Sequence, residues 1–359
     1  MKILVVSGSS GGHIFPALSF IGAIREKQKN AAVLLLLPER VRQKQIPVQG
    51  VALKYISTAQ INLTFDWKNI PACFEYLKGI AQSFFIITEF KPDLVVGFGS
   101  IDSIPCMMLA WLFRTRTLIH EQNVVPGRAN KLLAKFVDKI ALSFAQTGPA
   151  LKVNASKLVI TGNPIRNDLI RIGREQALDF FGFKDKLTVL VTGGSQGSSR
   201  INEYFFKAIK GPGDLQVIHI CGASDRASLT KSYTEAGIAA KVFPFLKEMQ
   251  YAYSAADLAV CRGGATTIAE LSYYALPAII IPYPYAYAHQ LENAKILEKQ
   301  GSALIVLDKD LDSGVLTEKL SRCVDRKVLD NMRLSYGSID RPAASELLAD
   351  AALLSIENG

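Results

Sequence analysis

A histidine in a glycine-rich turn is the residue of this sequence best suited to general-base chemistry. His13 ends the run Gly8-Ser9-Ser10-Gly11-Gly12-His13, which follows an apolar segment at Ile3–Val6. A helix is predicted to begin near Pro16, just after the turn. Because the positive end of a helix disfavours protonation of an imidazole, we expect His13 to stay neutral and able to accept a proton. A structural His13, hydrogen-bonded within the turn, is the alternative.

Two more glycine-rich turns lie in the second half of the chain, each between a predicted strand and a predicted helix. They read Gly193-Gly194-Ser195-Gln196-Gly197 and Arg262-Gly263-Gly264-Ala265-Thr266-Thr267. The helix after the second turn is predicted over Ile268–Tyr274 and carries Glu270. Amide groups at a helix start suit a diphosphate, and a carboxylate one turn further suits a pair of ribose hydroxyls. Since the carboxyl ends of parallel strands form the usual ligand edge of a sheet, the turns indicate a nucleotide site.

Polar residues also cluster where a protein core would not need them. His120-Glu121-Gln122-Asn123 ends an otherwise apolar strand, and Arg166 follows the turn Thr161-Gly162-Asn163-Pro164. Gln290 follows His289 after a proline-rich turn. Glu121 is the second candidate for the general base. Helix caps and hydrogen bonds within the fold are the alternative roles for these side chains.

The spacing of the same residue types argues against several common sites. Ser10 stands where a dinucleotide-binding GxGxxG fingerprint needs glycine, and no Gly-Lys-Ser/Thr follows as in a P-loop. The four histidines lack a metal-ligand spacing, and the five dispersed cysteines are typical of reduced core thiols. Asp308-Lys309-Asp310 and Asp310-Leu311-Asp312 match the DxD string of metal-dependent transferases. They precede a helix predicted near Ser313, so a capping loop is the preferred interpretation and no metal site is predicted.

The elements that must position these residues are short β-branched runs that alternate with amphipathic stretches. The predicted strands are Ile3–Ser7, Val33–Leu37, Leu94–Val96, Thr117–His120, Lys139–Leu142, Leu187–Thr192, Gln216–Cys221, Lys241–Phe243, Leu258–Cys261, Ala278–Pro282 and Leu304–Val306. This alternation predicts two doubly wound parallel-sheet domains, over residues 1–162 and 163–341. A last helix, within residues 342–356, is expected to pack back onto the first domain.

The composition is that of a globular protein whose excess positive charge lies in one half. The 359 residues are 49% hydrophobic and carry a net charge of +9. Residues 1–162 have a net charge of +10 (19 Lys and Arg against 9 Asp and Glu), and residues 163–359 a net charge of −1 (22 against 23). The basic half indicates an anionic partner, nucleic acid or a membrane surface, or else a solvated face. Without an export signal or a spanning apolar stretch, an intracellular protein, soluble or peripheral, is expected.

Five segments together resemble the MurG family of bacterial glycosyltransferases (glycosyltransferase family 28). They are Ser10–Pro16, His120–Asn123, Gly162–Arg166, Gly193–Gly197 and Cys261–Glu270. The resemblance covers nearly the whole chain. It implies the α/β fold called GT-B, with two Rossmann-like doubly wound domains facing a central cleft and no metal or other cofactor. It also implies inverting transfer of N-acetylglucosamine from UDP-N-acetylglucosamine to lipid I, an undecaprenyl-pyrophosphate-linked muramyl pentapeptide, in peptidoglycan synthesis.

The resemblance also assigns site residues by position. Those matched to UDP-N-acetylglucosamine binding are Ser10, Gly11, Gly12, Asn123, Arg166, Ser195, Leu246, Ala265, Thr266, Thr267, Ile268, Ala269, Glu270 and Gln290. The acceptor side is matched to Gly99, Ser100 and Ser103, in a loop that departs from the family's Gly-Gly-Tyr-x-Ser. A second departure replaces the family's Asp-Arg-Gln-Gln by Tyr287-Ala288-His289-Gln290.

The resemblance gives the basic half an expected task on the anionic cytoplasmic leaflet of the bacterial inner membrane. Aromatic residues expected near that surface are Phe65, Trp67, Phe74, Tyr76, Phe84 and Phe85. Core packing of these aromatics is the alternative. Two rival functions remain open. One is another GT-B enzyme acting on UDP-sugars, with a different lipid acceptor or as a 2-epimerase; the other is a binding protein without catalysis. Nucleic-acid binding is not expected, because no interleaved basic and aromatic motif occurs.

Overall fold

The computed structural model describes residues 1–42, 50–59, 70–194, 197–209, 215–223, 225–285, 289–337 and 343–357. Ser195, Phe65 and Trp67, for which roles were predicted, lie outside the described residues. The chain forms two compact units, Met1–Asn167 with Pro342–Gly359, and Asp168–Arg341. The boundary after Asn167 falls five residues later than the predicted one. Asn167 belongs to the first unit because its side-chain oxygen accepts a hydrogen bond of 2.8 Å from the Ser19 hydroxyl.

A seven-stranded parallel sheet forms the centre of the first unit, in the order β3-β2-β1-β4-β5-β6-β7. The strands are β1 (Lys2–Val6), β2 (Ala32–Pro38), β3 (Ala52–Ile56), β4 (Leu94–Gly97), β5 (Arg116–Glu121), β6 (Lys139–Leu142) and β7 (Leu158–Ile160). Strands β3 and β7, at the two edges, were not predicted. Neither is buried along its whole length: Lys54 interrupts the apolar residues of β3, and β7 is an apolar run of three residues that is partly exposed.

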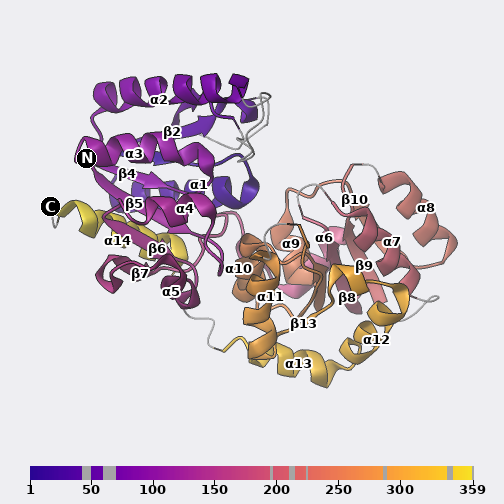
Figure 1. The fold of residues 1–359 in the computed structure, drawn as a ribbon. Helices are drawn as coiled ribbons and strands as arrows, with labels where there is room; N and C mark the ends of the chain where they lie inside the picture. The colour runs from indigo at the N-terminus through magenta and orange to yellow at the C-terminus, as the bar shows by residue number, and fades with distance from the viewer. Residues whose placement is uncertain are drawn as a thin grey trace. The chain divides into compact units, whose positions relative to one another are not determined.

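Helices cover both faces of this sheet (Figure 1). They are α1 (Gly11–Lys27), α2 (Ile70–Phe90), α3 (Ile104–Leu112), α4 (Arg128–Leu133), α5 (Gly148–Leu151) and α14 (Ala344–Glu357). Successive side chains of β1 point to opposite faces. Ile3 and Val5 therefore pack with α1 and α14, whereas Leu4 and Val6 pack with α2, α3 and α4. The C-terminal helix thus completes the core of the first unit.

The second unit holds a six-stranded parallel sheet in the order β10-β9-β8-β11-β12-β13. Its strands are β8 (Leu187–Thr192), β9 (Leu215–Ile220), β10 (Ala239–Phe243), β11 (Leu258–Cys261), β12 (Ala278–Ile280) and β13 (Ala303–Ile305). The helices are α6 (Arg174–Phe181), α7 (Ser199–Ala208), α8 (Arg226–Glu235), α9 (Met249–Ala255), α10 (Ala265–Tyr274), α11 (His289–Gln300), α12 (Ser313–Cys323) and α13 (Arg326–Leu334). A core cluster joins α7, α8, α12 and α13 to the sheet.

Strand order decides which turns lie together at the carboxyl edge of each sheet. In the first unit β1, β4 and β5 are neighbours, so the turns after Val6, Gly97 and Glu121 share one edge. In the second unit β8, β11 and β12 are neighbours, so the turns after Thr192 and Cys261 lie together at the carboxyl edge of that sheet. The prediction of two parallel-sheet α/β domains is confirmed, and the edge that carries ligands in such sheets carries the candidate residues.

Candidate active site

His13 lies in the first turn of a helix and faces the loop that follows β4. Helix α1 begins at Gly11, five residues before the predicted start, because the Ser10 carbonyl accepts the amide hydrogens of His13 and Ile14 at 3.0 Å each. The hydroxyl of Ser10 lies 2.9 Å from Nδ1 of His13. This bond orients the ring. When Nδ1 donates to the hydroxyl, Nε2 is the nitrogen that can accept a proton.

Glycines make room for the imidazole. A Cβ built on Gly8 would lie 2.9 Å from Nδ1 of His13 and 2.5 Å from Cβ of Ser100, which is too close for any side chain. A Cβ built on Gly99 would lie 3.4 Å from Nε2, and Gly99 has a φ of +79°, which other residues rarely adopt. The two turns therefore need glycine at these positions in order to approach the histidine.

Burial lowers the pKa of His13 below its usual value of 6.5, and the negative charge of Asp102 opposes that shift. The ring is therefore neutral at pH 7, as a general base requires. The direction of the shift is the predicted one, but its cause is desolvation by burial and not the helix end.

Asp102 is a buried carboxylate that the sequence analysis did not assign. It lies in the short helical turn Ile101–Ser103, and its oxygens accept hydrogen bonds from Arg40 (2.6 Å), the Thr58 hydroxyl (2.6 Å) and the Ser100 hydroxyl (2.7 Å). These partners come from three separate segments of the first unit. The sequence signal for Asp102 was a carboxylate in a loop that departs from the family pattern. Its partner Arg40 could not be predicted, because it is 62 residues away in the sequence.

The acceptor-side residues of this loop are engaged with one another. Ser100 has a φ of +72° and donates its hydroxyl to Asp102, and Ser103 donates its hydroxyl to the Ser100 carbonyl at 2.8 Å. The loop is thus shaped by its own serines and by Asp102. Contacts to an acceptor stay a prediction for Gly99, Ser100 and Ser103.

Glu121 organises the loop after β5. Its buried carboxylate accepts hydrogen bonds from the Asn123 amide (2.9 Å), the Gly127 amide (3.0 Å) and Nδ2 of Asn130 (2.8 Å), with a longer one from Nδ2 of Asn123. Accepting a proton would compete with these donors. The contacts describe a positioning role for Glu121 toward Asn123, and its role as reserve base stays a prediction.

The segment after β7 packs against α1. The Arg166 guanidinium lies over the Phe15 ring, 5.3 Å from its centroid. Nearby, the buried side chain of Asn163 makes no hydrogen bond within the described residues. Nε2 of His120 lies 3.0 Å from the Gly162 carbonyl, and burial lowers the pKa of this imidazole to about 4. Arg166 therefore contacts α1, the helix whose first turn carries His13.

In the second unit, α10 presents its first turn at the carboxyl edge of the sheet. The helix begins at Ala265, three residues before the predicted start, with Gly264 as its N-cap. The first amides of a helix have no acceptor inside it. The Thr266 hydroxyl is buried and lacks a hydrogen-bond partner within the described residues. An oxygen-rich anion at this turn would satisfy both kinds of donor.

The carboxylate of Glu270 follows one turn later and is held from behind. Its Oε2 accepts a hydrogen bond of 2.7 Å from the Tyr253 hydroxyl on α9. The Tyr253 ring in turn stacks on Tyr274, with centroids 5.0 Å apart. Glu270 is thus oriented by a rigid aromatic pair.

Gln290 ties the glycine turn after β11 to the segment after β12. Its Oε1 accepts the amide hydrogens of Gly263 (3.1 Å) and Tyr283 (2.9 Å). Asn293, one turn further along α11, donates to the Gly263 carbonyl at 3.3 Å. Because Oε1 is used within the protein, a contact from Gln290 to a ligand would fall to Nε2. Leu246, which follows β10, is buried.

Arg262 and Asp308 form a nearly buried ion pair that the sequence analysis missed. Nη1 of Arg262 lies 2.5 Å from Oδ1 of Asp308, and Nη2 donates to the Ser198 hydroxyl at 2.8 Å. Arg200 also pairs with Asp308, at 3.4 Å. The pair joins the segments after β11 and β13, and the bond to Ser198 extends the contact to the segment after β8. The first aspartate of the DxD string therefore serves the scaffold of the second unit.

The last aspartate of the DxD string caps a helix, as predicted. Oδ1 of Asp312 accepts the amide hydrogen of Val315 at 2.7 Å, at the start of α12. Across the part of the chain that the structure describes, no three His, Cys, Asp or Glu side chains are grouped to hold a metal ion.

Comparison with known proteins accounts for both units. The glycosyltransferase family 28 N-terminal domain matches residues 3–142, and the family 28 C-terminal domain matches residues 188–339. The chain belongs to glycosyltransferase family 28. The resemblance drawn from the sequence motifs is thereby confirmed.

Relatives within family 28 match over nearly their whole length. A protein of Thermoanaerobacter sp. (strain X514) is 35% identical over 355 residues, covering 96% of this chain and 97% of that protein. A protein of Halothermothrix orenii is 35% identical over 361 residues, covering 97% of each chain. Both are named UDP-N-acetylglucosamine--N-acetylmuramyl-(pentapeptide) pyrophosphoryl-undecaprenol N-acetylglucosamine transferase.

Solved structures agree with this family assignment. The crystal structure of Acinetobacter baumannii MurG superposes with a TM-score of 0.79 at 27% identity, covering 98% of this chain and 99% of that one. The glycosyltransferase of kitacinnamycin superposes with a TM-score of 0.71 at 16% identity, covering 99% and 98%, and shows a shared fold alone. The predicted GT-B fold is therefore confirmed.

Proposed function

We propose that this family 28 enzyme transfers N-acetylglucosamine from UDP-N-acetylglucosamine to the muramyl C4 hydroxyl of lipid I, giving lipid II and UDP. The full-length match to relatives with that name is the main support. The neutral His13 at the carboxyl edge of the first sheet agrees with it, because attack by a sugar hydroxyl needs a nearby base.

The proposed reaction is a single displacement with inversion at the anomeric carbon. His13 takes the proton of the acceptor hydroxyl as its oxygen bonds to that carbon, and the bond to the UDP oxygen breaks. Negative charge then develops on the diphosphate. The first-turn amides of α10, the Thr266 hydroxyl and Arg166 are proposed to stabilise that charge, while Glu270 binds the ribose hydroxyls.

The remaining matched residues are proposed to hold the donor. Backbone groups near Leu246 bind the uracil, and Nε2 of Gln290 binds the sugar. Asn123, positioned by Glu121, contacts the same sugar. No metal is proposed to take part, since the amides and the arginine supply the positive charge that a cation would otherwise provide.

A UDP-release assay tests the function directly. UDP-N-acetylglucosamine is supplied with and without a lipid I analogue, in buffer that contains EDTA. We expect release only with the acceptor, and no loss of rate in EDTA. Release that needs no acceptor, or conversion of the donor to its C2 epimer, would favour a different UDP-sugar enzyme. Release abolished by EDTA and restored by Mg²⁺ would contradict the metal-independent mechanism alone.

We further propose that an apolar patch on the first unit binds the membrane, which we call the α2–α3 patch. Large exposed side chains gather on these two packed helices and just after α3. They are Phe74, Leu77, Phe84, Phe85, Trp111, Leu112 and Phe113. The rings of Phe84 and Phe113 lie 5.6 Å apart, so the two helices share one aromatic surface.

Basic side chains accompany the α2–α3 patch. Lys78 is exposed on α2 and Arg114 is exposed just after α3. Lys131 and Lys135 are exposed on and after α4, which packs on α3. Exposed apolar groups together with lysine and arginine suit an anionic bilayer surface. No helix of the described residues is long and apolar enough to cross a membrane, so peripheral attachment to the cytoplasmic leaflet is proposed.

Vesicle flotation measures this attachment. With vesicles containing anionic phospholipid, Phe85→Asp and Leu112→Asp are each expected to lower the amount of bound protein about ten-fold. Each variant places a charge where an apolar side chain is proposed to enter the bilayer surface. Phe180→Asp, at an exposed aromatic of the second unit, is the matched control and should bind like the wild type. Binding that is unchanged in both patch variants would exclude the α2–α3 patch as the attachment surface.

A further inference from the structure

The second unit contains a cavity at the amino edge of its sheet, opposite to the glycine turns. Its volume is about 420 Å³. Asp185 precedes β8, Asp257 directly precedes β11 and Leu276 precedes β12, and all three line it. The donor turns follow the other ends of these strands. The cavity therefore lies at the opposite edge from the donor turns. Tyr253 links the two places, because it lines the cavity and donates its hydroxyl to Glu270.

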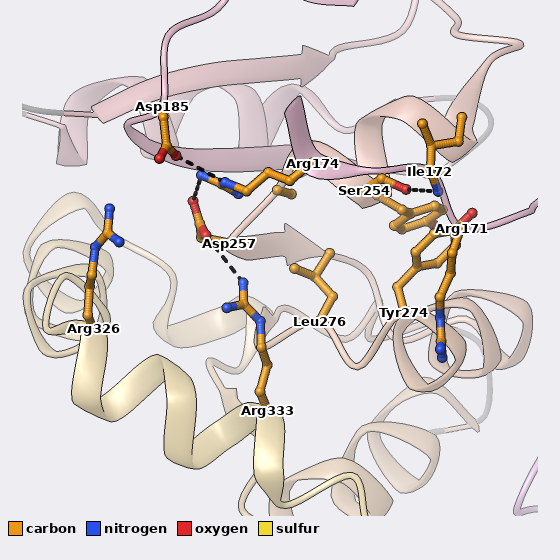
Figure 2. Close-up of a pocket in the computed structure, with 12 residues that line it drawn as sticks. Arg171, Ile172, Arg174, Asp185, Ser254, Asp257, Tyr274, Leu276, Arg326 and Arg333 are labelled. Carbon is orange, nitrogen blue, oxygen red and sulfur yellow. Dashed lines mark hydrogen bonds and ion pairs between the residues drawn. The ribbon is translucent and has the colours of Figure 1, made fainter. Parts of the chain in front are cut away.

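Arginine is the main charged residue of this cavity. Arg171, Arg174, Arg326 and Arg333 line it against two aspartates, so its wall has an excess of two positive charges (Figure 2). Arg174 is fully engaged, since its guanidinium bonds Asp185, Asp257 and the carbonyls of Ala255 and Lys186. Arg171 donates to the Tyr273 carbonyl. Arg333 pairs with Asp257 and with Asp330, at 3.2 and 3.7 Å. Within the described residues, the charges of this wall without a carboxylate partner therefore belong to Arg171 and Arg326.

Helix α13 presents two arginines of the wall, Arg326 and Arg333, on one face. Arg326 and Arg333 are seven residues apart, which is about two helical turns, and Figure 2 shows both side chains extending from α13 toward the side of Asp257. Nη2 of Arg333 lies 3.2 Å from Oδ1 of Asp257. Within the described residues Arg326 makes no ion pair or hydrogen bond through its guanidinium. All five of its N–H donors are thus available to a ligand.

We propose that this cavity is a second anion site, which binds a small phosphorylated molecule through Arg326 and Arg333. A phosphate monoester or diphosphate carries close to two negative charges near pH 7 and has three acceptor oxygens at its terminal group. That charge matches the excess of the wall, and those oxygens match the forked donors of two arginines. The cavity has the size of a metabolite site, and Tyr253 and Tyr274 give it a flat wall for the rest of the molecule.

Calorimetric titration with pyrophosphate tests the site. The protein is first titrated with UDP, and a failure of the proposed donor site would appear in this titration as absent UDP binding. Pyrophosphate is then added at saturating UDP, so that the donor site is already filled. We expect one further pyrophosphate per chain. Arg326→Gln should weaken its binding about ten-fold or more, because charge-assisted hydrogen bonds are lost. Arg326→Lys keeps the charge but not the forked donors, so its affinity for pyrophosphate should lie between those of the wild type and Arg326→Gln.

The matched control is Lys327→Gln, which removes an equal charge from the next residue of α13, outside the cavity. It should bind pyrophosphate like the wild type. Thermal unfolding of each variant verifies the fold, which Arg326 does not support by any ion pair of the described residues. Absence of a second binding event, or equal weakening by Lys327→Gln, would overturn the site. Tighter binding of malonate than of pyrophosphate would overturn its assignment to phosphate.

Discussion

Replacing His13 with alanine is expected to lower kcat by about 10²–10⁴-fold, the usual contribution of a positioned general base. Burial keeps this imidazole neutral, and its Nδ1 is held by the Ser10 hydroxyl at 2.9 Å. The binding of UDP should change little, because the proposed nucleotide contacts are Arg166 and residues of the second unit, and none of them is His13. The measurement is acceptor-dependent UDP release, with UDP affinity determined in parallel.

The pH profile separates a base from a structural histidine. Since the pKa of His13 is lowered, the neutral form persists below pH 6.5, and the acidic limb of kcat/KM should lie below that value. The negative charge of Asp102 raises the pKa of His13. Asp102→Asn should therefore move the limb to still lower pH. An unchanged limb in Asp102→Asn, together with a rate retained in His13→Ala, would exclude His13 as the base and direct attention to Glu121.

The second large effect is expected at Glu270. Glu270→Gln should weaken UDP binding about ten- to one-hundred-fold, because hydrogen bonds from ribose hydroxyls to a carboxylate contribute roughly 1.5–3 kcal/mol. The wild type should also bind UDP more tightly than 2′-deoxy-UDP, and the variant should lose most of that preference. Calorimetry with the two nucleotides measures both quantities.

Tyr253→Phe is the control for this prediction. It keeps the carboxylate but removes the hydrogen bond of 2.7 Å that orients it, so a smaller loss of UDP affinity is expected. The discrimination against 2′-deoxy-UDP should survive. If Glu270→Gln retained full discrimination, the ribose would be held by other groups, and Glu270 would serve only to position α9 against α10.

The sequence by itself determined the two sheets and the edge that carries their ligands. Inner parallel strands are buried on both faces, so β1, β4, β8 and β11 appear as continuous apolar runs, and glycine turns follow three of the four. Edge strands β3 and β7 were missed: Lys54 interrupts the apolar residues of β3, and the short apolar run of β7 was not recognised as a strand. The motifs also predicted the family, because a turn before a helix is a local pattern that can be read from adjacent residues.

Helix starts could be predicted only within a few residues. Gly11 and Gly12 have poor helix propensity, costing about 1 kcal/mol each, so the helix was predicted to begin near Pro16. In the folded chain the Ser10 carbonyl accepts hydrogen bonds from His13 and Ile14, and this turn becomes the first turn of α1 beside the Gly99 loop. Tertiary packing thereby outweighed local propensity, and His13 became a residue of the helix itself.

Only the tertiary structure decided which charges meet. Asp102 bonds Arg40 across 62 positions of the chain, Arg262 pairs with Asp308 across 46, and Arg333 meets Asp257 across 76. No periodicity or motif links such pairs. Their encounters depend on strand order and on the helix face that each side chain occupies. A sequence therefore shows which residues can do chemistry, whereas long-range packing sets their partners, because the register between distant elements is fixed only when the sheets assemble.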